Sequence, residues 1–195
     1  MPELPDTRAS LLVRVSDPSD HEAWREFAAI YRPAVYRLGR RRGLQDPDAD
    51  DLAQRVLMAV SQKIGDWRPT SPKASFRGWL AAVTGNAIVN ALTRVGVAPG
   101  KGGTSVVEKL ARHPDKNEAL PEFDEEYRRA LFRRASEEIR REFHDSTWQA
   151  FWMTAVEGVS IEAAAERLQK SPGVIYASRS RVMRRLREKV EELNA

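Results

Sequence analysis

The pattern with the clearest chemistry lies near the C-terminus, where residues 172–193 are rich in arginine. A helix that enters the major groove of DNA carries base-contacting side chains near its N-terminus and cations for phosphates further along. The candidates are Ser171, Tyr176, Ser178 and Arg179 at the base edges, and Arg181, Arg184 and Arg185 at phosphates or flanking bases. The alternative is a basic face that is merely solvated.

The residues before this helix indicate how it would be positioned. Ser160 can cap a short helix that ends at Leu168, and Ser171-Pro172 is a strong start for the next one. A short helix, a tight turn and a longer basic helix are typical of a helix-turn-helix. The apolar positions expected to face its core are Val174, Ile175, Val182, Leu186 and Val190.

A second group of polar side chains begins the helix expected over residues 46–64. Asp48, Asp51 and Gln54 follow each other at three-residue spacing, which places them broadly on one exposed side. Acidic residues in a first turn also complement the helix dipole. These residues therefore either bind a partner or only cap and solvate the helix.

The helix expected over residues 76–95 carries the third candidate group. Its apolar positions Phe76, Trp79, Leu80, Val83, Ile88 and Leu92 are predicted to be core, Trp79 included. Asn86 is polar and lies in mid-helix, where asparagine has a poor helix propensity. An amide offers both a donor and an acceptor to a base edge, but Asn86 can equally face solvent or pack against a helix.

Helical spacing recurs along nearly the whole chain, and no stretch alternates as a strand would. We expect further helices at residues 7–15, 19–42, 122–143 and 146–156, with Pro33 kinking or splitting the second of them. Residues 96–121 are rich in glycine and proline and predict a flexible linker, with a short helix at 106–112. The expected fold is all-α, with small helical domains at residues 1–95 and 122–195.

Composition limits the classes of protein that fit. The 195 residues carry a net charge of +4 and no cysteine, which excludes disulfides and thiolate sites. Arginines gather at residues 37–42 and 179–187 and acidic residues at 46–51 and 122–126, which suggests separate surfaces for phosphates and for a protein. With no signal peptide pattern and no long apolar run, we expect a cytoplasmic protein without membrane insertion.

The C-terminal strings GVSIEAAAERL, QKS and PGVIYASRSRVMRRLREKV resemble region 4 of the extracytoplasmic-function (ECF) subfamily of sigma-70 factors. The string DPDADDLAQRVLMAVSQKI resembles region 2.2 of that family, and FRGWLAAVTGNAIVNALTR resembles regions 2.3 and 2.4. Tyr176-Ala177-Ser178 replaces the basic triplet common in the family, and Arg55 replaces an acidic residue. TWQAFW and VIYASRSRV resemble a planctomycete-type subgroup.

This resemblance implies an initiation factor whose partners are core RNA polymerase, promoter DNA and an anti-sigma factor. The residues implied to bind polymerase are Asp48, Asp51, Leu52, Gln54, Arg55 and Met58. Those implied at the –10 element are Trp67, Arg68, Arg77, Asn86, Asn90 and Arg94, with the loop 66–73 completing a pocket for an unstacked base. The basic helix would read the –35 element.

No catalytic pattern competes with this interpretation. His21, His113 and His144 lie in separate segments, and the chain has no P-loop, GxSxG or HExxH motif. Residues 46–51 lack the EF-hand pattern. We therefore expect no enzyme activity, cofactor or metal. Two other classes stay open: a stand-alone helix-turn-helix regulator that binds DNA without polymerase, and a helical scaffold that binds only proteins.

Overall fold

The structure, a computed structural model, describes residues 7–69, 74–95 and 120–194, and every regular element in these ranges is helical. The expected all-α class is therefore confirmed for the described residues. Residues 96–119 of the predicted linker, including its short helix, and loop residues 70–73 lie outside them. Contacts divide the chain into two units, Met1–Ala130 and Leu131–Ala195.

The division between the units falls inside a helix, α6 (Leu120–Ile139). The sequence placed the start of the second domain at residue 122, and that boundary stays a prediction. By contacts, the first eleven residues of α6, 120–130, belong to the first unit. The two units are described separately below.

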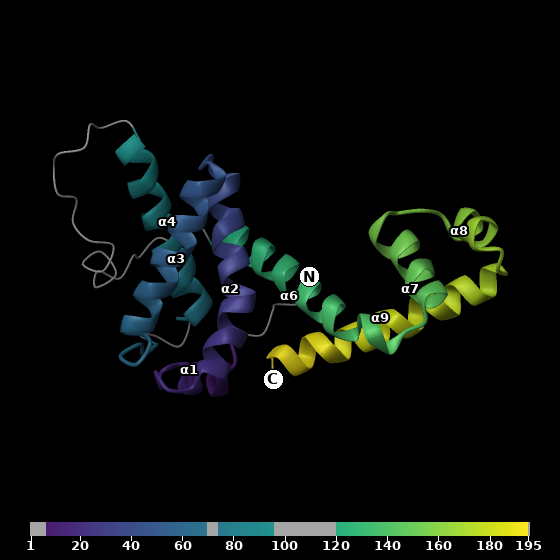
Figure 1. The fold of residues 1–195 in the computed structure, drawn as a ribbon, viewed down its shortest axis with the longest axis horizontal. Helices are drawn as coiled ribbons and strands as arrows, with labels where there is room; N and C mark the ends of the chain where they lie inside the picture. Colours follow the sequence, from purple (N-terminus) through teal and green to yellow (C-terminus); the bar gives the residue numbers. More distant parts are fainter. Residues whose placement is uncertain (1–6, 70–73, 96–119, 195) are drawn as a thin grey trace. The chain divides into compact units, whose positions relative to one another are not determined.

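The first unit contains α1 (Ala9–Val15), α2 (His21–Arg41), α3 (Asp46–Lys63), α4 (Phe76–Val95) and the beginning of α6. Helices α2, α3 and α4 lie side by side (Figure 1). The Asp20 carboxylate caps α2 by accepting from the Ala23 backbone N–H at 2.8 Å. Helix α2 continues through Pro33, so the expected split is absent. Gly43, with φ of +98°, follows its end.

Aromatic rings fill the centre of the first unit. Phe27, Tyr31 and Phe76 are almost fully buried, with the Phe27 and Tyr31 ring centroids 4.4 Å apart. Tyr127 of α6 stacks on Tyr31 at 5.2 Å, and Phe123 of α6 is also fully buried. The Tyr31 hydroxyl is hydrogen-bonded to Thr7 Oγ1, while burial raises the pKa of Tyr31 well above its ordinary value. The beginning of α6 thus completes this core.

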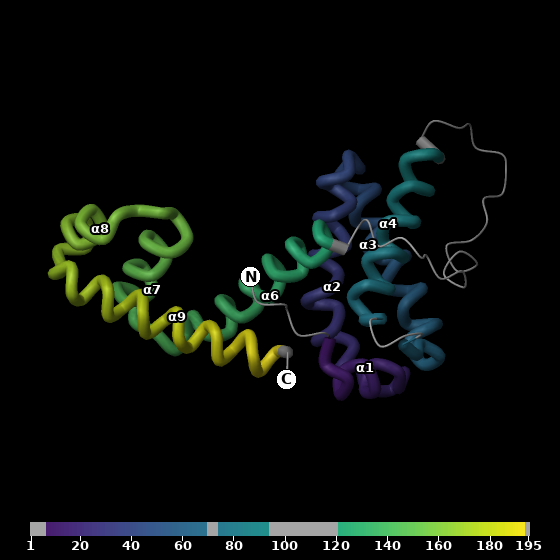
Figure 2. Tube along the Cα trace, turned by 180° about the vertical axis from the view of Figure 1, so that it is seen from behind, coloured from purple at the N-terminus to yellow at the C-terminus, as the bar shows by residue number. Residues whose placement is uncertain are grey.

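The second unit contains the rest of α6, a 3₁₀ turn (Arg140–Glu142), α7 (Asp145–Phe151), a π-helical turn (Trp152–Val156), α8 (Ile161–Leu168) and α9 (Pro172–Asn194). Figure 2 shows α7 and α8 against α9. The sequence predicted one helix over 122–143 and one over 146–156; each instead changes its hydrogen-bonding register in its last turn. The predicted helices at 160–168 and 172–193 are confirmed.

Two apolar clusters hold the second unit together. The first joins α6, α7 and α9 through Ile139, Phe151, Val182 and their neighbours. The second packs Ala164 and Ala165 of α8 against Ile175 of α9, where the small alanine side chains allow a close approach. Within the described ranges, no helix is both long enough and apolar enough to cross a membrane.

Candidate nucleic-acid and protein interfaces

The exposed side of α3 carries most of the residues predicted to bind a protein. Asp48, Gln54 and Met58 are exposed, Met58 at 62%. Pro47 in the first turn and two acidic residues beside it favour the start of this helix. The Gln54 amide donates to Asp50 at 3.2 Å, which orients it on the surface. These side chains form an open polar surface with one large apolar group.

Two residues of this set have other partners. Leu52 is 1% exposed and lies in the core, because it falls on the same stripe as buried Ala49 and Val56. Arg55 pairs with Asp51 at 2.8 Å along the helix. The cation that replaces the family's acidic residue therefore offsets the charge of Asp51. We leave Leu52 out of the candidate surface.

Helix α4 and the segment before it hold the residues predicted at the –10 element. Asn86 is exposed and Asn90 is half-buried. Trp67 packs edge-on against Phe76, with their ring centroids 5.5 Å apart. Arg68 donates to the Trp67 carbonyl at 2.7 Å. The side chain of Arg94 and residues 70–73 lie outside the described part. Leu92, predicted as core, is 42% exposed, because it lies near the end of α4.

Arg77 has a different environment from the one expected of a phosphate contact. It is 6% exposed, its Nε donates to Asp124 at 2.9 Å, and its guanidinium lies 5.1 Å from the centre of the Tyr127 ring. All three residues lie in the first unit. In this structure Arg77 holds the beginning of α6 against α4, so we also leave it out of the candidate surface.

The acidic segment 122–126 was expected on a protein-binding surface, and sequence reasoning missed its internal role. Glu122 pairs with Arg42 at 2.6 Å, and Glu125 pairs with Arg41 at 2.5 Å. The hydrogen bond from Arg41 holds the pKa of Glu125 below its ordinary value. The arginines at the end of α2 and the glutamates at the beginning of α6 thus neutralise each other. The only signal in the sequence was their opposite charge, which does not specify pairing.

In the second unit, α8, a tight turn and the longer α9 follow one another as the sequence predicted, and their function as a helix-turn-helix stays a prediction. The Ser160 hydroxyl caps α8 by accepting from the Ala163 N–H at 3.2 Å. Gln169 adopts a left-handed conformation with φ of 51°, which ends α8. Lys170 N–H then donates to the Ala165 carbonyl at 2.9 Å. The turn therefore leads directly into α9, with Ser171 exposed at its start.

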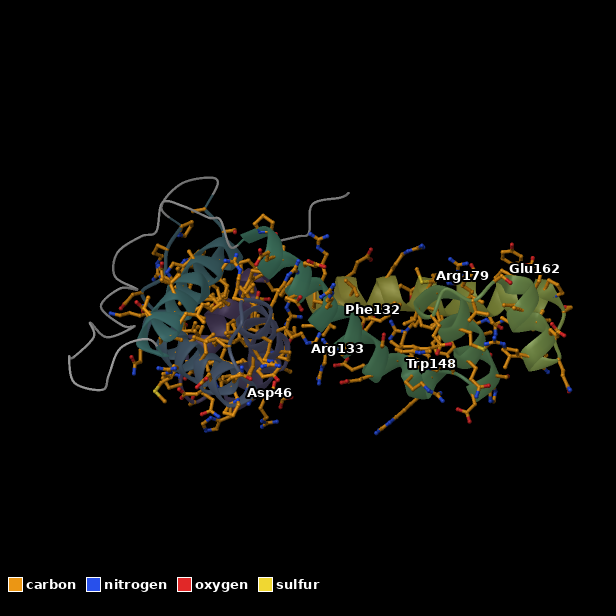
Figure 3. The ribbon with its side chains drawn as sticks, turned by 90° about the horizontal axis from the view of Figure 1, so that it is seen from above. Asp46, Phe132, Arg133, Trp148, Glu162 and Arg179 are labelled. Atoms are coloured by element: carbon orange, nitrogen blue, oxygen red, sulfur yellow. The ribbon has the colours of Figure 1, made fainter. Side chains whose placement is uncertain are left out.

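Helix α9 presents part of the predicted set to solvent. Tyr176, Arg179, Arg181 and Arg184 are exposed, and Figure 3 shows Arg179 on this helix. Ser178 is 8% exposed because it lies three residues after Ile175 and four before Val182, on the buried stripe. Val174, predicted as core, is 46% exposed in the first turn.

Arg185 serves the fold of the second unit. It donates to Glu142 at 2.7 Å and to Glu192 at 2.9 Å, and these hydrogen bonds raise its pKa above the ordinary arginine value. It therefore does not join the exposed arginines. Among the residues that the structure describes, no three acidic or histidine side chains gather as metal ligands do.

Comparison with known proteins identifies the first unit. Residues 27–96 match the family described as Sigma-70 region 2. The chain contains a sigma-70 region 2 domain. A segment of 90 residues, 46% of this chain, is 27% identical to the ECF RNA polymerase sigma factor SigE of Mycolicibacterium smegmatis. That segment spans about a third of the length of the curated relative, 34%.

The matched region 2 domain contains most of α2 and all of α3 and α4, with the candidate surfaces on α3 and α4. Sigma factors are not enzymes, in agreement with the expectation from the sequence. The match to region 2 does not extend to the second unit, so its resemblance to region 4 stays a prediction. Neither match supports the planctomycete-type subgroup.

Proposed function

We propose that this chain is a sigma factor of the ECF type, which binds core RNA polymerase and directs promoter recognition and DNA melting at initiation. The observation that carries the proposal is the region 2 match over helices whose exposed polar residues fall on α3 and α4. Because a sigma factor works through differential binding of the open strand, it needs no catalytic group.

In this proposal the exposed side of α3 docks on the polymerase. The docking residues are Asp48, Asp51, Gln54, Arg55 and Met58. The region 2 domain would then capture the –10 strand with Trp67, Arg68, Asn86, Asn90 and Arg94. An exposed amide and an indole on the same domain suit a flipped base, which is held by stacking and edge hydrogen bonds. Arg77 and Leu52 support these surfaces from within the fold.

We assign the –35 element to a region 4-like second unit, which would read duplex DNA with α9. Tyr176 and Arg179 lie near its start, where base edges come within reach, and Arg181 and Arg184 follow for phosphates. Joining two weak DNA-binding modules in one chain raises the effective concentration of the second. An anti-sigma factor that covers the α3 or α9 surface would provide regulation.

Run-off transcription with purified core polymerase, with and without the chain, tests the proposal. We expect promoter-specific transcripts only when the chain is present. The double variant Asp51→Arg with Gln54→Ala should lose both core binding and transcription, whereas Gln62→Ala, exposed on the same helix, should keep both. If core polymerase does not bind the chain, and the double substitution changes neither binding nor transcription, the sigma-factor assignment is refuted.

The rival function is a stand-alone helix-turn-helix regulator. Its support is that the second unit, with its exposed arginines on α9, lies outside the region 2 match. A pull-down with core polymerase separates the two functions, because the regulator binds duplex DNA without polymerase. A scaffold that binds only proteins would show neither transcription nor DNA binding.

A further inference from the structure

The second unit contains a groove that the proposed DNA and polymerase contacts leave unused. It has a volume of about 470 Å³, within the range of roughly 300–1,000 Å³ typical of small-ligand sites. Arg133 and Trp148, two of its lining residues, are labelled in Figure 3. The other lining residues are Ser136, Glu137, Arg140, Gln149, Trp152, Met153 and Glu157.

Two indole rings and a thioether give the groove an apolar surface. The Trp148 and Trp152 ring centroids lie 6.0 Å apart with their planes 23° from parallel, and Met153 lines the groove beside them. The Arg140 guanidinium lies 5.3 Å from the Trp148 ring centre and is also paired with Asp145. Arg140 is therefore already engaged, while the aromatic surface can accept a flat apolar group.

Two residues that line the groove each carry a polar atom without a partner. Arg133 Nη2 and Ser136 Oγ are buried, and neither forms a hydrogen bond within the described part of the chain. Ser136 as a whole is only 5% exposed. These residues lie three apart on α6, so they share one face of the helix. Because buried polar atoms are nearly always hydrogen-bonded, the pair indicates an acceptor that the described chain does not supply.

The backbone of this groove is itself unusual. Trp152 and Met153 belong to the π-helical turn, Trp152–Val156, that follows α7. Such turns are rare and frequently occur at functional sites, because they redirect side chains relative to an α-helix. Here the turn supplies two of the apolar lining residues. It is an observation separate from the two unpartnered atoms, and it favours the same site.

We propose that this groove binds a small organic monocarboxylate with an aryl or other flat apolar body. The carboxylate would accept from Arg133 Nη2 and Ser136 Oγ, and the apolar body would lie on Trp148 and Trp152. Glu137 and Glu157 also line the groove, so its two arginines and two glutamates sum to no net charge. A groove without net charge does not compensate the two negative charges of a phosphate dianion. A single carboxylate, in contrast, can be satisfied by the two unpartnered donors.

Naphthylacetate and its neutral isostere naphthylacetamide test the proposal with the full-length chain labelled with nitrogen-15. The five tryptophans each give one indole N–H signal, assigned by single Trp→Phe variants. We expect naphthylacetate to shift the Trp148 and Trp152 signals saturably, with a Kd of about 1 mM or below, and to leave Trp24, Trp67 and Trp79 unmoved. The amide should bind about tenfold more weakly, because it loses the charge-assisted hydrogen bonds.

Variants locate the carboxylate. Arg133→Gln should weaken naphthylacetate binding about tenfold, and Ser136→Ala should weaken it by a smaller factor. Arg141→Gln, at an exposed position next to Arg140 in sequence and outside the groove lining, should bind as the parent does. Unshifted Trp148 and Trp152 signals, equal affinity for acid and amide, or unchanged binding by Arg133→Gln would each overturn the proposal.

A blocked helical peptide that presents leucine and glutamate one turn apart tests the rival occupant. If it binds the groove more tightly than naphthylacetate does, the groove is a protein-docking surface and the small-ligand proposal is overturned. Because these measurements use neither DNA nor polymerase, they succeed or fail independently of the sigma-factor assignment.

Discussion

The two units of this chain use arginine in opposite ways. In the first unit, Arg77 is buried against Asp124, while Arg41 and Arg42 pair with carboxylates of the beginning of α6. In the second unit, Arg179, Arg181 and Arg184 are exposed, and no ion pair involving them occurs in the described residues. The arginines at the end of α2 thus serve the fold, whereas several of the cluster 179–187 stay available to a polyanion.

Helix α9 contains both uses within a few residues. Arg184 is exposed, whereas Arg185 bridges two glutamates and Lys189 pairs with Glu138 at 2.8 Å. The beginning and middle of the helix therefore suit DNA, and its end fastens it to α6. Charge alone does not locate a nucleic-acid surface; the acidic partners contributed by other helices decide it.

The largest expected effect separates the buried arginine from the exposed ones. Arg77→Met leaves the Asp124 carboxylate, 20% exposed, without its cation. Because removing one partner of a buried ion pair leaves an uncompensated charge, the free energy of unfolding should fall by about 3 kcal/mol, measured by urea denaturation. The control Arg179→Met should change it by less than about 0.5 kcal/mol. Equal stability of both variants would contradict the distinction.

The next effect concerns DNA affinity. Replacing Arg179, Arg181 and Arg184 together by Gln should lower duplex affinity roughly a hundredfold near physiological salt, because one base contact and two phosphate contacts are lost. The slope of log affinity against log salt should become less steep by about 2, because two phosphate contacts no longer release counterions. Arg185→Gln should leave that slope unchanged and destabilise the second unit. A slope change for Arg185→Gln would place it with the DNA contacts.

A smaller effect tests how the second unit holds its basic helix. Ser160→Ala removes the cap of α8 and should destabilise that helix by about 1 kcal/mol, seen as faster amide hydrogen exchange over residues 161–168. Ser180→Ala, in the exposed middle of α9, should slightly stabilise its helix, since alanine has the higher propensity. Slower exchange in α8 after Ser160→Ala would contradict the capping role.

The smallest effect is a pH dependence confined to the first unit. Because the hydrogen bond from Arg41 lowers the pKa of Glu125 in the folded state, the ionised carboxylate adds stability above its unfolded pKa. This stability is lost as the pH falls through the folded pKa. Glu125→Gln should therefore flatten the acid limb of stability against pH. The effect is small, since Glu125 lies at the surface. Identical acid limbs for parent and variant would show that the pair adds nothing.

Helical periodicity was enough to predict the helices and most of the exposed residues. The same periodicity places Leu52 and Ser178 on the apolar stripes of α3 and α9, where both are buried. Leu52 was assigned to a surface through the family resemblance instead, and Ser178 through its place in the first turns of the basic helix. Leu92 and Val174 show the opposite error, because periodicity continues to a helix end where the packing neighbours run out.

Contacts distant in sequence were beyond prediction. Arg77 and Asp124 lie 47 positions apart, and no local pattern connects them. The unpartnered atoms of Arg133 and Ser136 were equally hidden. A serine and an arginine three residues apart on a polar helix look solvated in sequence, and only the packed fold reveals the burial of these two atoms.

The way α6 completes the first core has a consequence for synthesis on the ribosome. Phe123 and Tyr127 are buried there beside Tyr31, yet they are made well after α2, α3 and α4. Bringing together segments so distant in sequence costs little more entropy than bringing together nearer ones, but it imposes an order on folding. The nascent region 2 domain exposes one side of its aromatic centre until the beginning of α6 has emerged. Its folding is therefore finished by a segment that is translated after the domain itself.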